Sequence, residues 1–437
     1  MDRFRIRGGL RLRGAVPVSG SKNAALPILC ASLLTTDTLK IRRAPVLRDM
    51  ENLQRVLEVL GTASERLPDG SLVLKTLDES KSIAPYELVS TMRGSFAVLG
   101  PLLGRRRSAR VSLPGGCVIG VRPVDLHLKG LRALGADLRV EEGYVVANAP
   151  PGGLRGARVY LGSANGSTVL GTANVLMAAV YARGKTVIES AACEPEIADL
   201  CRCLVAMGAR IEGIGSPTLE IQGVDDLHGA EHSIIPDRIE AGTFVIAGVL
   251  AGGTVDVVGA RPEDLDALFD RLTEAGAKFE VLPDGTIRTH GGATLRATDA
   301  TTHPHPGFPT DLQAQWMTAM AVADGVALIT ERIFQDRYTH AAELMRMGAQ
   351  IRREGPSAIV RGVRALSGAP VMASDLRASA ALVIAGLVAH GETFIRRVYH
   401  IDRGYECIVE KLAALGADIV REEDRAMATE AAAGGES

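Results

Sequence analysis

The sequence predicts a mixed α/β (α+β) protein of two domains, each built from three copies of one small unit. Three observations support this prediction: a length of 437 residues, a glycine-centred phrase that recurs six times, and a second phrase that recurs four times. Hydrophobic cores stop growing at roughly 250–300 residues, so a chain of this length divides into domains. Six copies of one unit then fall into two sets of three.

The first phrase predicts the end of a helix and the start of a strand. It reads apolar, Gly, small, polar, apolar, and its glycines are spaced by 74, 73, 68, 72 and 68 residues. In residues 268–275 the apolar positions follow a helical period, and Gly276 fits the position after a helix that requires positive φ. Residues 277–281 alternate in polarity, which predicts a strand. The six glycines are Gly61, Gly135, Gly208, Gly276, Gly348 and Gly416.

The second phrase predicts another helix end in the same unit. A helical pattern closes on a glycine and a β-rich run follows at Gly184, Gly253, Gly325 and Gly391. Each unit is therefore expected to hold about two helices and several strands. We place the join between the domains midway along the chain, near Pro236.

Composition narrows the classes of function. The net charge of -2 gives no general attraction to nucleic acid or membranes, and only 4% of residues are aromatic, which disfavours a stacking platform for single strands. Apolar runs are far shorter than the roughly 20 residues of a membrane span. The six cysteines form neither a CxxC pair nor a zinc-ligand pattern, and Cys201 and Cys203 are interpreted as packing residues. Reduced thiols and the lack of a secretion signal favour a cytoplasmic location.

The first polar group lies at residues 19–23, Ser-Gly-Ser-Lys-Asn, before an apolar run. This pattern predicts a strand end, a tight turn and a helix start, capped by Ser21 or Asn23. Free N–H groups at a helix start favour an anion, and Lys22 would stand beside them. The alternative is a capped helix with a solvated lysine.

The second group is the loop Ser112–Pro123, which reads SLPGGCVIGVRP. Its glycines make the backbone pliable, and Cys117 stands five residues before Arg122. A thiol with an ordinary pKa near 8.5 is mostly protonated at neutral pH and able to donate a proton, whereas a nearby guanidinium would make it more nucleophilic. From these residues alone, Cys117 could be a proton donor, a nucleophile or an inert thiol.

Further charged residues complete the candidates. Arg93 leads an apolar stretch that predicts a helix, and Asp311 follows two prolines. Two Asp/Arg pairs occur at Asp375-Leu376-Arg377 and Asp402-Arg403. Each feature alone is better explained by a solvated or surface-paired side chain. Together they give three candidate clamps for a multiply charged anion, with Asp311 as a candidate base. The clamps are Lys22, Arg122 and Arg403.

Taken together, these residues resemble those of a known family, the UDP-N-acetylglucosamine 1-carboxyvinyltransferases. The resemblance extends from the N-terminus to Gly416 and rests on long segments in the same order. These segments are SGSKNAALPIL, TMRGSFAVLGPL, SLPGGCVIGVRPVDLHLKGLRALGA, EPEIADL, PDRIEAGTF, HPGFPTDLQAQW, DLRASAALVIAG and YHIDRGYE.

The resemblance implies two inside-out α/β barrel domains, each of three βαβαββ repeats, with the active site in the cleft between them. The first domain would span residues 22–235 and carry the mobile cysteine loop. The second would combine residues 1–21 with 236–425, because the N-terminal strand of this family crosses into it. Residues 426–437 are small and polar, and we expect a disordered tail.

The implied reaction transfers the enolpyruvyl group of phosphoenolpyruvate to the 3′-hydroxyl of UDP-N-acetylglucosamine and releases phosphate, the first committed step of peptidoglycan synthesis. Neither a metal nor an organic cofactor is implied. By position, Cys117 matches the proton donor, which fosfomycin-like epoxides alkylate, and Asp311 or Asp375 matches the base. The positions that match phosphoenolpyruvate contacts are Lys22, Asn23, Arg122 and Arg403. Those that match sugar-nucleotide contacts are Asn23, Arg93, Arg122, Pro123, Val124, Asp125, Leu126, Asp311 and Ile333.

One segment departs from the family pattern. Where the family has a run such as SVGATEN, this chain has residues 167–174, STVLGTAN, with Leu170 in place of the first glycine and no preceding lysine. The family's contacts to the nucleotide therefore transfer least well to this segment.

Two alternative functions agree less well with the same residues. The sister enzyme 3-phosphoshikimate 1-carboxyvinyltransferase shares the fold and chemistry but lacks the PGGCVIGVRPVDLH loop present here. A catalytically silent paralogue that binds a UDP-sugar would not need Lys22, Cys117, Asp311 and Arg403 together. Release of phosphate distinguishes the enzymes from the binder, and the acceptor substrate distinguishes the two enzymes.

Overall fold

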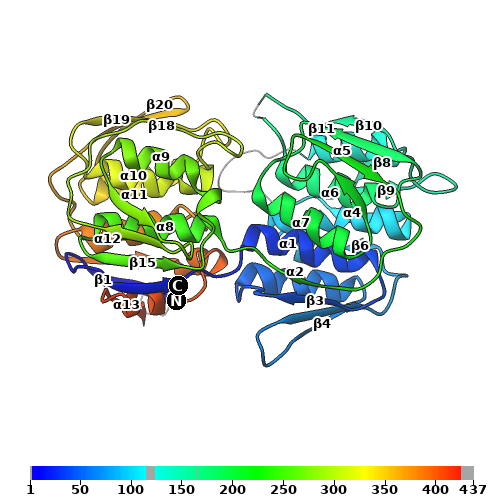
Figure 1. The fold of residues 1–437 in the computed structure, drawn as a ribbon, viewed down its shortest axis with the longest axis horizontal. Coiled ribbons are helices and arrows are strands. Elements are labelled where there is room, and N and C mark those ends of the chain that lie inside the picture. The colour runs from blue at the N-terminus through cyan, green and yellow to red at the C-terminus, as the bar shows by residue number, and fades with distance from the viewer. Residues whose placement is uncertain (1, 115–123, 165, 425–437) are drawn as a thin grey trace, which may run out of the picture. The chain divides into compact units, whose positions relative to one another are not determined.

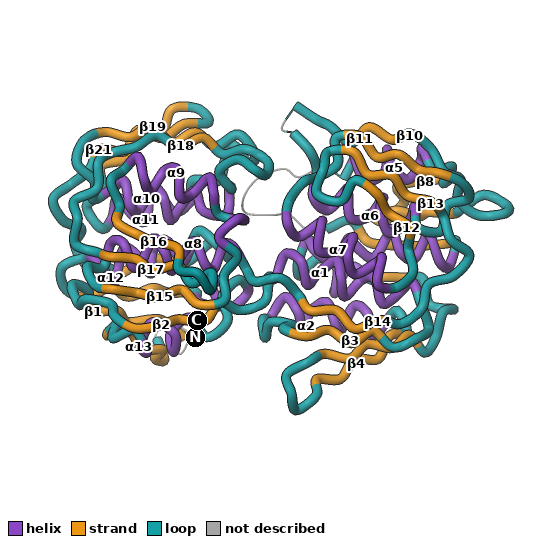
Figure 2. Tube along the Cα trace, in the orientation of Figure 1, coloured by secondary structure: helices purple, strands orange, loops and turns teal. Residues whose placement is uncertain are grey.

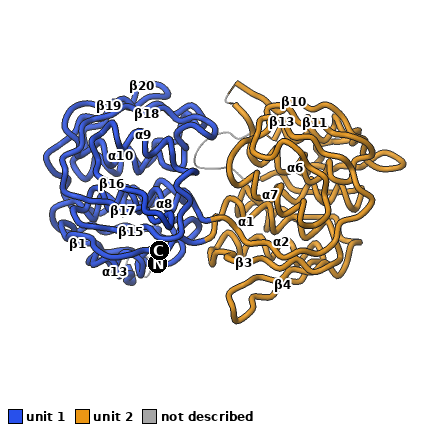
Figure 3. Tube along the Cα trace, viewed as in Figure 1, with its two compact units in different colours: residues 1–19, 118–120, 236–437 blue, residues 20–117, 121–235 orange. Residues whose placement is uncertain are grey.

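The structure is a computed structural model that describes residues 2–114, 124–164 and 166–424. The chain divides into two compact units (Figure 3). Unit 1 contains residues 2–19 and 236–424, and unit 2 contains the described residues between 20 and 235. The chain thus begins in unit 1, builds all of unit 2, and returns to unit 1 at Pro236. The predicted tail, 426–437, lies outside the described residues.

In unit 2, short strands and short helices alternate along the chain (Figure 1). Its strands are β3 (Leu39–Arg42), β4 (Thr62–Arg66), β5 (Leu72–Thr76), β6 (Ile83–Ala84), β7 (Ser108–Ser112), β8 (Asp137–Glu141), β9 (Tyr144–Asn148), β10 (Arg158–Tyr160), β11 (Lys185–Glu189), β12 (Arg210–Glu212), β13 (Thr218–Gln222) and β14 (Ala230–Ser233). Its helices and helical turns are α1 (Lys22–Cys30), η1 (Ala31–Leu34), α2 (Arg48–Val59), α3 (Tyr86–Val89), η2 (Arg93–Val98), α4 (Leu99–Pro101), η3 (Leu102–Arg106), α5 (Asp125–Ala133), α6 (Val169–Ala179) and α7 (Pro195–Ala206).

Unit 1 repeats this alternation. Its strands are β1 (Asp2–Arg7), β2 (Gly14–Pro17), β15 (Thr254–Val258), β16 (Lys278–Val281), β17 (Ile287–His290), β18 (Ala300–Thr301), β19 (Val326–Thr330), β20 (Gln350–Glu354), β21 (Ser357–Arg361), β22 (Pro370–Met372), β23 (Glu392–Arg396) and β24 (Asp418–Glu423). Its helices and helical turns are α8 (Arg238–Leu250), η4 (Pro262–Asp264), α9 (Asp266–Glu274), η5 (Thr310–Leu312), α10 (Gln313–Ala321), α11 (Thr339–Arg346), α12 (Ser379–Val388), η6 (Val398–Arg403) and α13 (Ile408–Ala414).

The strands of the described chain form six four-stranded sheets of one design. In the sheet β18-β19-β21-β20 the first pair is parallel and the other two pairs are antiparallel. With α10 and α11 this sheet is one βαβαββ repeat. In the sheet β22-β23-β1-β24 the third strand is the N-terminal β1, paired to β23 and β24. The predicted fold class, two α/β domains of repeated units, is confirmed.

The most apolar helices, among them α6, α8, α10 and α12, lie inside their units with sheets outside them, as Figure 2 shows. A helix that is apolar on every side must be buried on every side. Every residue of α10 and eight of the nine residues of α1 are buried. The surrounding sheets are half-exposed, and β19 alternates buried Ala327 and Ile329 with exposed Leu328. Among the described helices, none is long and apolar enough to cross a membrane.

The predicted helix ends are confirmed at the six glycines of the first phrase. All six have positive φ, between 81° and 104°. At the end of α9 the N–H of Ala277 donates to the carbonyl of Leu272, and the N–H of Gly276 donates to that of Thr273. This is the Schellman pattern, which places its C′ residue in a left-handed conformation that glycine adopts without steric cost. Cys201 and Cys203 are fully buried in α7, so the interpretation of both as packing residues is also confirmed.

The single helix predicted after Arg93 is instead a series of short helical turns, η2, α4 and η3. The N–H of Gly100 donates to Asn174 Oδ1 in α6 at 2.7 Å. A Cβ on Gly100 would lie 2.1 Å from the carbonyl oxygen of Asn174. Close packing on α6, together with Pro101, therefore overrides regular α-helical hydrogen bonding in this segment.

Candidate active site

Lys22 is the first residue of α1 in unit 2, directly after its cap. The hydroxyl of Ser21 accepts a hydrogen bond from the N–H of Ala24, so the cap is Ser21 rather than Asn23. Lys22 is buried, and its Nζ lies 2.9 Å from Asp49 Oδ2 in α2. A buried ammonium requires such a partner. The sequence pattern suggested a solvated lysine as the alternative, and the structure instead holds the charge inside, at the start of the helix.

Arg93 lies on η2, which packs beside α1, and α5 meets η2 in turn. Arg93 opens η2, where a Cβ on Gly94 would lie 2.8 Å from the Leu26 side chain of α1. The ring of Phe96 meets that of His127 edge-on at 5.2 Å. Burial and the charge of Arg93 lower the pKa of His127 to about 3, so this imidazole is neutral. Lys22 and Arg93 therefore lie at the starts of two elements that pack together, and His127 contacts the second of them.

The residues before His127 carry three of the sequence-predicted nucleotide contacts. Val124 precedes α5, Asp125 begins it with an exposed side chain, and Leu126 is half-buried. Asn23 is also half-buried, one residue into α1. Cys117, Arg122 and Pro123 lie outside the described residues.

In unit 1 the two candidate bases meet on one arginine. Arg337 is buried, and its Nη1 lies 2.7 Å from Asp311 Oδ1 while its Nη2 lies 3.1 Å from Asp375 Oδ1. Burial disfavours the charged guanidinium, but the charges of Asp375 and Asp311 outweigh it and raise the pKa of Arg337. Two carboxylates that are distant in sequence are thereby held in one network.

The two carboxylates differ in what remains available to a ligand. Asp375 Oδ1 also accepts the N–H groups of Arg377 and Ala378, each at 2.7 Å. Burial raises the pKa of Asp375, but Arg337 and these N–H groups lower it below its ordinary value. The Asp375 side chain is 4% exposed, whereas that of Asp311 is 23% exposed. Asp311 is the one that a solute can reach.

Glu331 positions the loop of Ile333 against that of Asp311. Its Oε1 accepts the N–H of Ile333 at 2.8 Å, and its Oε2 accepts the hydroxyl of Thr310 at 2.8 Å. Glu331 is fully buried, so these hydrogen bonds are protected from water. Ile333 itself is half-buried beside this network.

Arg403 ends η6, next to a residue that is hydrogen-bonded to the segment of Asp375. The carbonyl of the next residue, Gly404, accepts a hydrogen bond from Arg377 Nη1 at 2.6 Å. Burial, Arg397 and Arg403 lower the pKa of His400, while Asp375 opposes this shift. Asp311, Ile333, Asp375 and Arg403 therefore lie around one buried cluster of unit 1.

Three residues of these clusters were missed by the sequence reasoning: Asp49, Arg337 and Glu331. Asp49 is 27 residues from Lys22, and Arg337 is 26 and 38 residues from its two carboxylates. No local spacing encodes such pairs. The available signal was residues 331–338, ERIFQDRY, where charged and apolar residues mix without a helical period just before a helix.

The segment that departs from the family pattern forms the start of α6. Thr168 caps the helix by accepting the N–H of Gly171 at 3.2 Å. Leu170 is partly buried and packs against the core of unit 2. The leucine is accommodated as a core contact at the first turn of the helix.

Comparison with known proteins assigns the family. A family profile described as EPSP synthase (3-phosphoshikimate 1-carboxyvinyltransferase) matches residues 6–412. The chain belongs to this family. It is thus a member of the enolpyruvyl transferase superfamily, whose reactions join phosphoenolpyruvate to a second small molecule.

Solved structures agree with this assignment. The chain is similar to the enolpyruvyl transferase NikO from Streptomyces tendae, with 26% identity and a TM-score of 0.86 over 96% of this chain and 99% of that chain. Two structures of EPSP synthase from Acinetobacter baumannii have 17% and 18% identity, TM-scores of 0.73 and 0.72, and cover 97% of this chain and 100% of those chains. At that identity the latter two establish the fold alone.

Proposed function

We propose that this enolpyruvyltransferase uses UDP-N-acetylglucosamine as acceptor and transfers to its 3′-hydroxyl the enolpyruvyl group of phosphoenolpyruvate, with release of phosphate. The observation that carries this choice is the loop Ser112–Pro123, in which Cys117 stands between glycines and before Arg122. The 3-phosphoshikimate 1-carboxyvinyltransferases share the fold of this chain but lack this loop. The proposed role is in peptidoglycan synthesis.

The proposed acid is the Cys117 thiol. It donates a proton to the methylene carbon of phosphoenolpyruvate while the acceptor hydroxyl attacks the adjacent carbon. A tetrahedral intermediate forms, and loss of phosphate together with one methyl proton restores the double bond. A thiol is protonated at neutral pH and suits this general-acid step.

The proposed base is Asp311, because its carboxylate is the more exposed of the two. It takes the proton of the sugar hydroxyl as the new bond to carbon forms. Arg337, at 2.7 Å, holds the carboxylate in one orientation, and Asp375 fixes Arg337 from the other side. Asp375 therefore acts as a positioning residue in this proposal.

The proposed clamp for phosphoenolpyruvate consists of Lys22 and Asn23 at the start of α1 with Arg122 and Arg403. The helix start contributes N–H groups that favour the phosphate. Asp49 already holds Lys22 Nζ in place at 2.9 Å, so little ordering of this side chain is required when the substrate arrives. We propose that residues of both units act on one substrate molecule.

A second candidate is transfer to 3-phosphoshikimate, favoured by the description of the matching family profile. Release of phosphate should be measured with phosphoenolpyruvate and either UDP-N-acetylglucosamine or shikimate 3-phosphate. We expect turnover with the sugar nucleotide only. Turnover with shikimate 3-phosphate alone would select the second candidate, and binding of the sugar nucleotide without phosphate release would indicate a binding protein.

A matched pair of lysine variants tests the site. Lys22→Ala should abolish phosphate release, whereas Lys40→Ala should not. Lys40 is a partly exposed lysine of the same unit whose Nζ lies 3.4 Å from Asp69. Equal rates for the two variants would remove Lys22 from the proposed clamp.

A further inference from the structure

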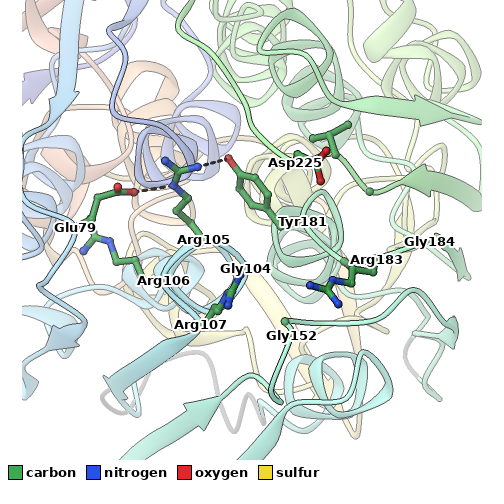
Figure 4. Close-up of a pocket in the computed structure, with 14 residues that line it drawn as sticks. Glu79, Gly104, Arg105, Arg106, Arg107, Gly152, Tyr181, Arg183, Gly184 and Asp225 are labelled. Atoms are coloured by element: carbon green, nitrogen blue, oxygen red, sulfur yellow. Dashed lines mark hydrogen bonds and ion pairs between the residues drawn. The ribbon is translucent and has the colours of Figure 1, made fainter.

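Unit 2 contains a hollow of about 760 Å³ beside the longest run of basic residues in the chain. Its walls include Arg105–Arg107, the turn Gly152–Gly153, and Tyr181–Gly184 (Figure 4). None of the candidate active-site residues described above lines it. The volume falls in the range of small-molecule sites.

Two of the arginines are committed to the protein. Arg105 Nε lies 2.7 Å from Glu79 Oε1, and its Nη1 lies 2.6 Å from Asp226 Oδ1. Arg106 Nη1 donates to the carbonyl of Leu60 at 2.8 Å. Both side chains form part of the wall. The charge of Arg105 is compensated by two carboxylates, and Nε and Nη2 of Arg106 are buried.

Arg107 and Arg183 differ, because both are exposed and neither forms an ion pair with any residue that the structure describes. They approach one glycine turn. A Cβ on Gly152 would lie 3.0 Å from Arg183 Nη1, and a Cβ on Gly153 would lie 4.0 Å from Arg107 Nε. Figure 4 shows the guanidinium of Arg183 extending toward Gly152, with Arg107 on the other side of that glycine.

The backbone around this pair is unusual. Gly152 and Gly153 have φ of 90° and 91°, and Arg107 itself has φ of 62°. A left-handed conformation is unfavourable for a residue with a long side chain and is concentrated at functional positions. Arg107 adopts this conformation as the residue that ends η3.

The repeats of the chain supply an internal comparison. Helices α8, α10 and α12 occupy the same place in their repeats as α6, and the residue before the glycine that precedes the next strand is Gly252, Asp324 and His390. Only α6 carries an arginine, Arg183, at this point among these four. Completing the end of a helix in this repeat therefore does not require a basic side chain.

We propose that the hollow binds a small phosphomonoester dianion between Arg107 and Arg183. Two guanidiniums without a carboxylate partner among the described residues offer paired donors to phosphate oxygens. Asp225 lines the same hollow, is exposed, and offers an acceptor for a hydroxyl of the ligand. This inference does not depend on the acceptor that the enzyme uses.

The test is isothermal titration with glycerol 3-phosphate at low ionic strength, on the full-length protein. The variant Arg107→Ala/Arg183→Ala should weaken binding at least about tenfold, the loss expected for charge-assisted hydrogen bonds. The control variant Arg139→Ala/Arg210→Ala removes two exposed arginines from strands of the same unit and should bind as the parent does. Lys22→Ala, which alters only the proposed active site, should also retain this binding.

The ionisation of the ligand gives a second measurement. A phosphomonoester has a second pKa near 6, so binding should weaken as the pH falls from 7.5 to 5.5. Glycerol should not bind. Equal affinity for the parent and Arg107→Ala/Arg183→Ala, or an equal loss in the Arg139→Ala/Arg210→Ala control, overturns the proposal. Unchanged thermal unfolding of each variant shows that the loss is local.

Discussion

Replacing Arg337 with methionine tests whether this buried guanidinium holds the carboxylate network together. The side chain of Arg337 is 4% exposed and compensates Asp311 and Asp375. Removing one partner of a buried ion pair costs about 3–5 kcal/mol, because the remaining charge stays buried without compensation. Asp375 would keep the N–H groups of Arg377 and Ala378. We therefore expect a loss of about 3 kcal/mol at pH 7.5, the lower end of that range.

The loss should depend on pH in a defined direction. In the parent the pKa of Asp375 is lowered, so this group stabilises the fold above its unfolded pKa of about 3.9 and loses that contribution as the pH falls. In Arg337→Met the guanidinium no longer opposes the effect of burial, so the pKa of Asp375 is higher than in the parent. Asp375 then takes up a proton at a higher pH than it does in the parent, and the difference between variant and parent should narrow by about 1.4 kcal/mol for each unit by which its pKa in the variant exceeds the pH.

The chain offers a convenient probe and a matched control. Trp316 is the single tryptophan, is fully buried in α10, and its fluorescence reports urea unfolding of unit 1. Arg332→Met removes an exposed arginine from the loop that follows β19, and this control should lose little stability. The reasoning is wrong if Arg337→Met loses less than about 1 kcal/mol at pH 7.5, or if its loss is the same at pH 7.5 and near pH 4.5.

Three further predictions concern the proposed chemistry and the core of unit 2. Cys117→Ser should largely abolish phosphate release near neutral pH, because a hydroxyl is a far weaker acid than a thiol, and a rate like that of the parent would remove the acid role. Arg403→Ala should weaken the use of phosphoenolpyruvate far more than binding of the sugar nucleotide, and calorimetry with each ligand would reveal the opposite order. His127 has a pKa of about 3 in the fold and about 6.5 when unfolded, so it costs stability as the pH falls below 6.5. His127→Gln should therefore reduce the acid sensitivity of unfolding by about 1.4 kcal/mol per pH unit between pH 6 and 4, measured by circular dichroism, and an unchanged slope would contradict this assignment.

The fold was predictable where local backbone geometry determines it. Gly276 could be assigned from sequence because a Schellman end needs only the residues around it. The segment after Arg93 could not, because Gly100 gives its N–H to Asn174, which is 74 residues away. Tertiary packing decided that hydrogen bond, and no periodicity records it.

The candidate site was predictable to a similar extent. Lys22 was recognised from its place at a helix start, but its burial against Asp49 depends on how α1 packs on α2. Asp311 and Asp375 were both named as candidate bases, yet their connection through Arg337 joins three distant segments. Residue type and local position identified the reactive groups, and only the folded chain supplies their partners.

The pairing of β1 with β23 and β24 constrains the order in which the protein matures on the ribosome. Strand β1 lacks both of its neighbours until β23 and β24 emerge, more than 380 residues later. All described residues of unit 2 lie between residues 20 and 235, so they are synthesised long before that point. We therefore expect unit 2 to fold during translation, while unit 1 closes its final sheet only after the C-terminal strands leave the exit tunnel.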